Sequence, residues 1–322
     1  MKKLAYLVSA IAAAFTGVAH ADVSVSGSAD AGYVNNQAGN GVISIGVVTS
    51  FAMSTTTANG VGIAASTSLS NDQDSNQTGN AAATGGNKVT FTTSGATIVV
   101  GDVELGDTPG SIGGVVGNIV DDVNGFDSDV KTGFADDDGT GVTFSTSVGG
   151  MTVGFGYIVN DSGDNQGNID ATSAQTMSAF NLSMPMGDYT ITAGVANHDS
   201  GESASGATIA AAMAGGTLKL GYSQQSLKSA GTYDSGSDLA SDGDSTVMGA
   251  TYSMSLDADT TVAVGYKNAK DGDSQSITQT DLSISRSLGG GASVYLDMRN
   301  LQGDVDSSKS GSAVGFGTAV SF

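Results

Sequence analysis

Charged side chains at two places in the sequence could act together on a passing ion. The stretch 101–139 is dense in acids, and Lys131 is its only base. A second, basic group lies much later in the chain. Opposite charges that face each other across a narrow aqueous passage set up a field that selects ions. The candidate residues are the acids Asp107, Asp121, Asp122, Asp127 and Asp129 and the bases Lys219, Lys267 and Arg299.

Catalytic chemistry has little support in the sequence. His198, next to Asp199, is the only His after position 21, and no nucleophile-elbow motif accompanies it. A catalytic triad would need a nucleophile that the fold brings to this His. We therefore predict that the protein is not an enzyme.

A calcium loop is the best alternative for the acidic segments. Asp72, Asp74 and Asn76 have the odd spacing of calcium ligands, but Ala83 stands where a bidentate Glu is needed. Residues 136–138 form another cluster of acids. We expect solvated acidic loops and no cofactor, with weak Ca²⁺ binding left open.

The composition excludes several classes of protein. The chain has 322 residues and a formal net charge of −21, with 48 Gly, 2 Pro and neither Cys nor Trp. So strong an acidic balance excludes binding to nucleic acid, which requires a basic surface. Without Cys, neither a disulfide framework nor a thiolate metal site can form.

The first 21 residues have the pattern of an export signal. Lys2 and Lys3 precede an apolar run at 4–18, and Ala19-His20-Ala21 follows as a cleavage site. The apolar run is shorter than the roughly 20 residues of a spanning helix. We predict a signal peptide at 1–21 and a single domain at 22–322.

The rest of the chain consists of segments of about ten residues with alternating apolar and small polar side chains, which is typical of transmembrane strands. Seven short connections that contain Gly or Asp alternate with eight more polar loops. The sixteen predicted strands are 22–33, 42–54, 61–70, 88–94, 96–103, 140–148, 151–160, 175–184, 189–198, 206–214, 217–225, 245–254, 260–269, 277–287, 292–301 and 312–322.

The two faces of these strands differ in a way that requires lipid outside and water inside. Val314, Phe316 and Val320 alternate with Gly315 and Gly317 in the last segment, for example, and most charges lie on the small face. The pattern predicts an all-β fold, a transmembrane antiparallel barrel of sixteen strands. Arg286 is an exception on the large, outward face, and segment 96–103 is apolar on both faces.

At this point the chain resembles the Gram-negative trimeric porins, most closely the alphaproteobacterial general porins. Three segments carry the resemblance: DVSVSGSADAGYV at 22–34, KVTFTTSGATIVVGDVELGD at 88–107 and AVGFGTAVSF at 313–322. They are similar to the first strand of that family, to the hairpin that leads into its third loop, and to its closing strand. The chain departs from the family in having few bases on the wall.

The resemblance implies a location and partners. We expect the long third loop, about 104–139, to fold into the lumen of a barrel in the cell outer membrane of a Gram-negative bacterium. We expect a homotrimer in contact with membrane lipid and lipopolysaccharide, and Phe322 as a signal for the barrel-assembly machinery. The expected function is passive diffusion of small hydrophilic solutes and ions, with cations preferred. The alternative is a closed or plugged barrel whose acidic, calcium-binding loops act in adhesion or surface structure.

Overall fold

The computed structural model describes residues 22–35, 41–74, 83–105, 138–160, 176–198, 203–227, 243–270, 276–303 and 311–322. Sixteen β-strands make up this part of the chain. They are β1 (Asp22–Asn35), β2 (Gly41–Thr56), β3 (Gly62–Asp74), β4 (Ala83–Thr92), β5 (Ala96–Glu104), β6 (Asp138–Val148), β7 (Met151–Asn160), β8 (Met177–Met186), β9 (Tyr189–His198), β10 (Ser203–Met213), β11 (Gly216–Leu227), β12 (Gly243–Ser255), β13 (Thr260–Lys270), β14 (Ser276–Gly289), β15 (Ala292–Gly303) and β16 (Gly311–Ser321).

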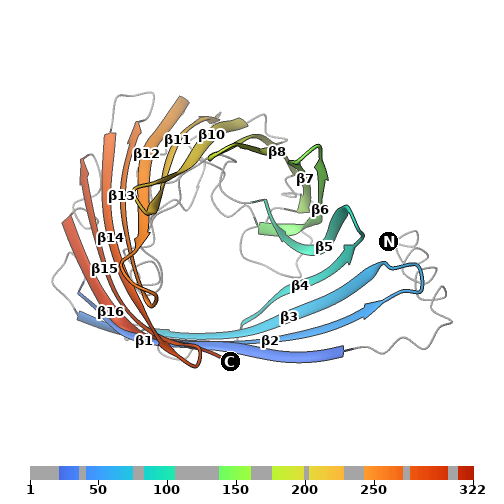
Figure 1. The fold of residues 1–322 in the computed structure, drawn as a ribbon, viewed down its shortest axis with the longest axis horizontal. Helices are drawn as coiled ribbons and strands as arrows, with labels where there is room; N and C mark the ends of the chain where they lie inside the picture. Colours follow the sequence, from blue (N-terminus) through green and yellow to red (C-terminus); the bar gives the residue numbers. More distant parts are fainter. Residues whose placement is uncertain are drawn as a thin grey trace.

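The strands form one closed barrel. Each strand pairs antiparallel with its neighbours in the sequence, and β16 pairs with β1, so the sheet has no free edge. Figure 1 shows the strands around a ring, with red β16 beside blue β1. No helix in the described part of the chain has the length and apolarity to cross a membrane.

Every predicted strand is present, but several extend further than their alternation indicated. β3 continues to Asp74 and pairs with the longer β2, through Gly46↔Asp72 and Ser44↔Asp74. The assignment of Asp72 and Asp74 to a loop was therefore wrong. Polar residues can continue the ladder here because its hydrogen bonds do not depend on side-chain type.

The barrel has two distinct ends. At one end, which we call the turn end, seven short connections link β2 to β3, β4 to β5 and so on to β14 and β15. At the opposite end, the loop end, the connections lie mainly outside the described residues. Because strands extend past their predicted bounds, three of the gaps between strands at the loop end, 36–40, 199–202 and 271–275, are also short.

The turn between β10 and β11 shows how packing overrides turn chemistry. The sequence predicted a turn on Gly215-Gly216, but Met213 pairs with Gly216, so Ala214 and Gly215 form the turn. Ala214 has φ 49° and Gly215 has φ 81°, which fits a tight hairpin turn of type I′. The ring of Tyr252 lies over Gly216, where an added Cβ would be 2.8 Å from Cζ of the ring. A side chain at position 216 would collide with this ring, so Gly216 stays in the strand. Ala214, rather than Gly216, then occupies a left-handed position of the turn.

The outward face is apolar, as the sequence predicted. Phe155, Tyr157, Tyr222 and Tyr266 are exposed on the outer surface. Arg286 lies on the same face. It pairs with Thr260 and Val294, and Ile284, two residues away on the same side of β14, pairs with the outward Val262. Large apolar side chains that face away from the interior are the arrangement of a barrel in lipid.

Segment 96–103, whose orientation the alternation left open, has a definite orientation in β5. Ile98 and Val100 face outward and are exposed. Val99 and Val103 face inward and pack in an apolar cluster with Ile158. Both faces of β5 are apolar because the inward side chains pack in this cluster and the outward side chains belong to the apolar outer surface of the barrel.

The last residue of the chain completes the barrel. The backbone of Phe322 accepts a hydrogen bond from the N–H of Gly27 at 2.9 Å and donates one to the carbonyl of Gly27 at 3.0 Å. The ring lies on the outer face against Gly27, where an added Cβ would be 2.7 Å from Cζ. Phe322 thus adds both a backbone pair and an aromatic cover to the seam between β1 and β16.

We predict that this final pair matters for assembly. Deleting Phe322 removes two ladder hydrogen bonds, each of which contributes about 1 kcal/mol, together with the ring over Gly27. Heat-modifiable, protease-resistant barrel should form more slowly, and unassembled chain should accumulate in the periplasm. The substitution F322A, which keeps the backbone pair, should have a smaller effect, and F322Y should resemble the wild type. Normal barrel levels after the deletion would contradict the prediction.

Candidate functional site

The inner face of the barrel changes from exposed to buried along every strand of the wall formed by β12–β15. On β13, Thr261 at the turn end is exposed, Ala263 and Gly265 are half-buried, and Lys267 and Ala269 are buried. On β15, Ser293 is half-buried, whereas Asp297 and Arg299 are 0% and 1% exposed. Water therefore reaches the inner face most freely from the turn end.

Buried apolar side chains form an arc on the inner face at the loop end, from β5 through β7–β10 and β12–β16 to β1. It consists of two clusters with additional members on β1 and β16. Its residues are Val34, Val103, Ile158, Met177, Ala179, Ala196, Ala204, Val247, Ala269, Ile277, Leu301 and Ala313. Small or apolar inward residues were predicted for most of these strands, but alternation alone did not indicate their burial.

A buried polar band lies next to this arc, toward the middle of β13–β15. Asp281 and Arg299 are directly opposite each other on β14 and β15. Nε of Arg299 is 3.4 Å from Oδ1 of Asp281, and the two side chains are 0% and 1% exposed. The amide of Gln279 donates to both carboxylate oxygens, at 3.0 and 2.9 Å. The carboxylate is thus held by hydrogen bonds as well as by charge.

Small residues on neighbouring strands make room for these long side chains. A Cβ at Gly249 would lie 3.2 Å from Cγ of Lys267, and a Cβ at Gly317 would lie 2.5 Å from the hydroxyl of Tyr295. The inward glycines that look like featureless small positions in the sequence therefore have a specific use. They let the polar side chains lie flat against the wall.

The structure places the three predicted basic residues on the inner wall but in different surroundings. Lys267 and Arg299 are buried in the polar band, whereas Lys219 on β11 is half-buried. Their proposed acidic counterparts, Asp107, Asp121, Asp122, Asp127 and Asp129, lie outside the described residues. The charged constriction therefore stays a prediction.

Sequence reasoning overlooked other members of the wall. Asp281 and Gln279 are the immediate partners of Arg299. Lys88 on β4 is exposed on the inner face. The signal that could have found all three is alternation, because each directly precedes or follows an outward residue such as Val89 or Leu282.

The structure adds no support for a metal site or a catalytic site among the described residues. Among the described residues, no group of three or more His, Asp or Glu could hold a metal ion. His198 is the last residue of β9, and Asp199 lies outside the described residues. The acids at 136 and 137 lie outside them too, so the structure leaves calcium binding there untested.

Comparisons with known proteins support a single family. A model of Gram-negative porins matches residues 8–306. No curated protein matches the sequence. Among solved structures, a porin refined at 1.8 Å has a TM-score of 0.65 at 17% identity and covers 94% of this chain and 100% of its own.

Two further structures are similar in fold. A loop-deletion mutant of OmpT, an outer membrane protein of Vibrio cholerae, has a TM-score of 0.69 at 12% identity and covers 94% of this chain and 99% of its own. An anion-selective porin from Comamonas acidovorans has a TM-score of 0.64 at 14% identity, with coverage of 94% and 100%. At these identities the likeness shows the fold alone.

We predict that the buried pair Asp281–Arg299 is costly to break from one side. The substitution R299M leaves a buried carboxylate without its cation and should destabilise the barrel by roughly 3–5 kcal/mol. The double substitution D281L/R299M should recover much of this loss, because neither charge of this pair is then left buried without the other. Urea unfolding in detergent, followed by far-UV circular dichroism, measures both. Equal stability of the single and double variants would show that the pair does not act as a unit.

Proposed function

The chain belongs to the Gram-negative porin family and is therefore an outer-membrane channel for passive diffusion, and we propose that its pore carries small hydrophilic solutes with a preference for cations. Diffusion through a barrel of this size needs no catalytic group, because sixteen strands can enclose an aqueous channel. The turn end faces the periplasm in this proposal, as short turns do in bacterial outer-membrane barrels.

The observation that carries the proposal is the gradient of burial along the inner wall. Inward residues near the turn end, such as Ser253 and Thr261, are exposed, and those near the loop end, such as Val247 and Ala269, are buried. This supports a wide periplasmic vestibule that narrows toward the outside. Solutes would then be selected in the outer half of the barrel.

The state of the wall cations supports a preference for cations. Arg299 is paired with Asp281, and Lys267 is buried, so neither projects an uncompensated charge into open water. The whole chain carries −21. With its main wall bases shielded in this way, an acidic pore attracts cations and repels anions.

The constriction is proposed to lie in the insert at about 104–139, with Asp107, Asp121, Asp122, Asp127 and Asp129 as its acidic face. Support comes from their density in the sequence and from the resemblance to porins. Lys219 and the exposed Lys88 would provide the opposing charge from the wall. Charges at the narrowest point dominate selectivity, because the field is focused where water is thinnest.

We further propose that three chains associate side by side, surrounded by membrane lipid and lipopolysaccharide. The support is the family to which the chain belongs. The exposed apolar outer surface needs either lipid or another barrel as its partner. Insertion by the barrel-assembly machinery would then begin from the strand that ends at Phe322.

A second candidate function follows from the same burial gradient. The apolar arc at the loop end is almost fully buried, with Ile158, Ala269 and Ile277 at 0% exposure. A barrel that is packed at its outer mouth could be closed, and its acidic outer loops could then act in adhesion or calcium-bridged surface structure.

Conductance in a planar bilayer distinguishes the two functions. The purified protein should insert and give large, steady steps, because an open aqueous pore carries current at all times. A trimer should insert as three pores and close at high voltage in three equal steps. Silent insertion would favour the closed barrel, and single closures would contradict the trimer.

Ion selectivity tests the role of the insert. Replacing Asp121, Asp122, Asp127 and Asp129 with Asn should move the zero-current potential in a KCl gradient toward that of an unselective pore. The shift should be largest in dilute salt, because the Debye length falls from about 8 Å at physiological ionic strength to about 3 Å at 1 M.

The matched control replaces acids that lie on the wall near the loop end. Asp72 and Asp74 belong to β3 and carry the same charge per residue. Their replacement with Asn should change the potential much less than replacement of the acids in the insert. If both sets shift it equally, the insert does not form the constriction.

A further inference from the structure

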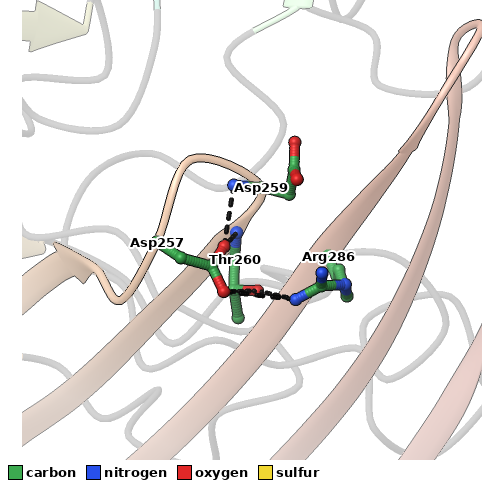
Figure 2. A network of polar contacts seen from close by, with 4 residues as sticks. All are labelled: Asp257, Asp259, Thr260 and Arg286. Atoms are coloured by element: carbon green, nitrogen blue, oxygen red, sulfur yellow. Dashed lines mark hydrogen bonds and ion pairs between the residues drawn. The ribbon is translucent and has the colours of Figure 1, made fainter.

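A polar network ties the β12–β13 turn to the end of β14 at the turn end of the barrel (Figure 2). Oδ1 of Asp257 accepts hydrogen bonds from the backbone N–H groups of Asp259 and Thr260, both at 2.8 Å. Oδ2 of Asp257 accepts one from the hydroxyl of Thr260 at 3.2 Å. The backbone N–H of Ser287 donates to the carbonyl of Asp259 at 2.8 Å, which fixes the turn against β14.

Arg286 joins this network through one nitrogen only. Nη1 donates to Oγ1 of Thr260 at 2.7 Å and lies 3.2 Å from Oδ2 of Asp257. Among the described residues, Nε and Nη2 have no partner, and the side chain is 51% exposed. Figure 2 shows these two nitrogens pointing away from the turn. The guanidinium is therefore held in place with a two-nitrogen edge open, which is the geometry that binds phosphate or carboxylate in a bidentate manner.

The surroundings of this open edge are those of a membrane interface. Arg286 lies on the lipid-facing side of the barrel, in register with Thr260 and Val294. Two residues farther from the turn end on the same face, Val262 pairs with Ile284. An apolar column thus runs from the guanidinium toward the middle of the membrane. Leu256 and Leu288, each 59% exposed, add apolar surface at the rim.

The charges of the network are mixed rather than purely basic. The side chain of Asp257 is 53% exposed and lies beside Arg286 (Figure 2). The hydrogen bond from the backbone of Asp259, followed by that from the Thr260 hydroxyl, holds the pKa of the Asp257 carboxyl below its ordinary value of 3.8. Asp257 is therefore an anion at neutral pH. A cation and an anion side by side fit a ligand that carries both charges.

We propose that Asp257, Thr260 and Arg286 bind the headgroup of a zwitterionic aminophospholipid in the periplasmic leaflet. The open edge of Arg286 holds the phosphate, and Asp257 accepts a hydrogen bond from the primary ammonium. The acyl chains lie along the column that begins with Val262 and Ile284. A free anion such as inorganic phosphate fits less well, because it has no ammonium group for Asp257 and would leave the apolar column uncovered.

Native mass spectrometry of the full-length barrel in detergent tests this site. The protein is titrated with phosphatidylethanolamine, and the R286Q variant is compared with K270Q. Lys270 is an exposed residue at the opposite end of β13, so K270Q removes the same charge from the other rim. R286Q should weaken lipid binding about tenfold, the loss expected for a charged hydrogen bond. K270Q should leave lipid binding unchanged, and equal affinity of the two variants would overturn the proposal.

A second variant separates the two halves of the headgroup. D257N keeps an oxygen for the N–H groups of the turn but loses the carboxylate charge. It should weaken binding of phosphatidylethanolamine and leave binding of phosphatidylglycerol, which has no ammonium, unchanged. R286Q should weaken both lipids, and R286K should be intermediate. Equal loss of both lipids in D257N would exclude ammonium recognition.

Two controls identify the source of the phosphate and guard against misfolding. An excess of inorganic phosphate should not displace the lipid; displacement would mean that the site binds free anions and would overturn the lipid assignment. Each variant is first tested for the heat-modifiable barrel form. If R286Q does not fold, the comparison of D257N with the wild type and with R286K decides the question. Native mass spectrometry counts bound lipids without measuring conductance. If it shows no lipid site, the proposed channel function is unaffected.

Discussion

Closure of the sheet is the constraint on which the rest of this structure depends. Inside a bilayer no water can satisfy a free N–H or carbonyl group, so a sheet that crosses a membrane must have no edge. The seam between β1 and β16 meets this requirement over most of its length and ends with the pair of Gly27 and Phe322. Because the ladder is continuous, the alternation of each strand becomes an inner and an outer surface. The polar and charged side chains then lie mainly on the inner surface, and the large apolar side chains lie mainly on the outer surface.

Two Arg–Asp ion pairs, one on each surface, differ strongly in how far they are buried. Arg299 and Asp281 face inward and are almost completely buried, and hydrogen bonds from Gln279 complete the carboxylate's coordination. Arg286 and Asp257 face outward at the rim and are about half exposed. A buried pair of this kind is costly to separate, whereas an exposed pair contributes little to stability. The first is therefore suited to hold the wall together, and the second is free to interact with a ligand from the membrane.

Glycines opposite aromatic rings recur where the barrel needs reinforcement. Phe322 covers Gly27 at the seam, Tyr33 covers Gly41 at the loop end, and Tyr252 covers Gly216 at a turn. Rings that cover strand glycines on a neighbouring strand supply contacts that glycine lacks. Tyr252 also donates to the carbonyl of Ala214 at 3.2 Å, so the same ring stabilises the turn beside it. The high glycine content is thus partly a consequence of cross-strand packing.

The sequence alone determined the number of strands, their antiparallel order and which side chains face lipid, because alternation with a period of two is a local property. It also placed Lys219, Lys267 and Arg299 on the inner wall. It could not determine burial, because Lys267 and Lys219 have the same pattern in sequence and differ only in what the closed barrel brings around them. It also missed the partners of Arg299 and Arg286, since Asp281 and Asp257 are 18 and 29 residues away. Those pairings depend on register between strands, and register is decided by the tertiary structure, where turns and close-packed glycines fix how each strand is aligned with the next.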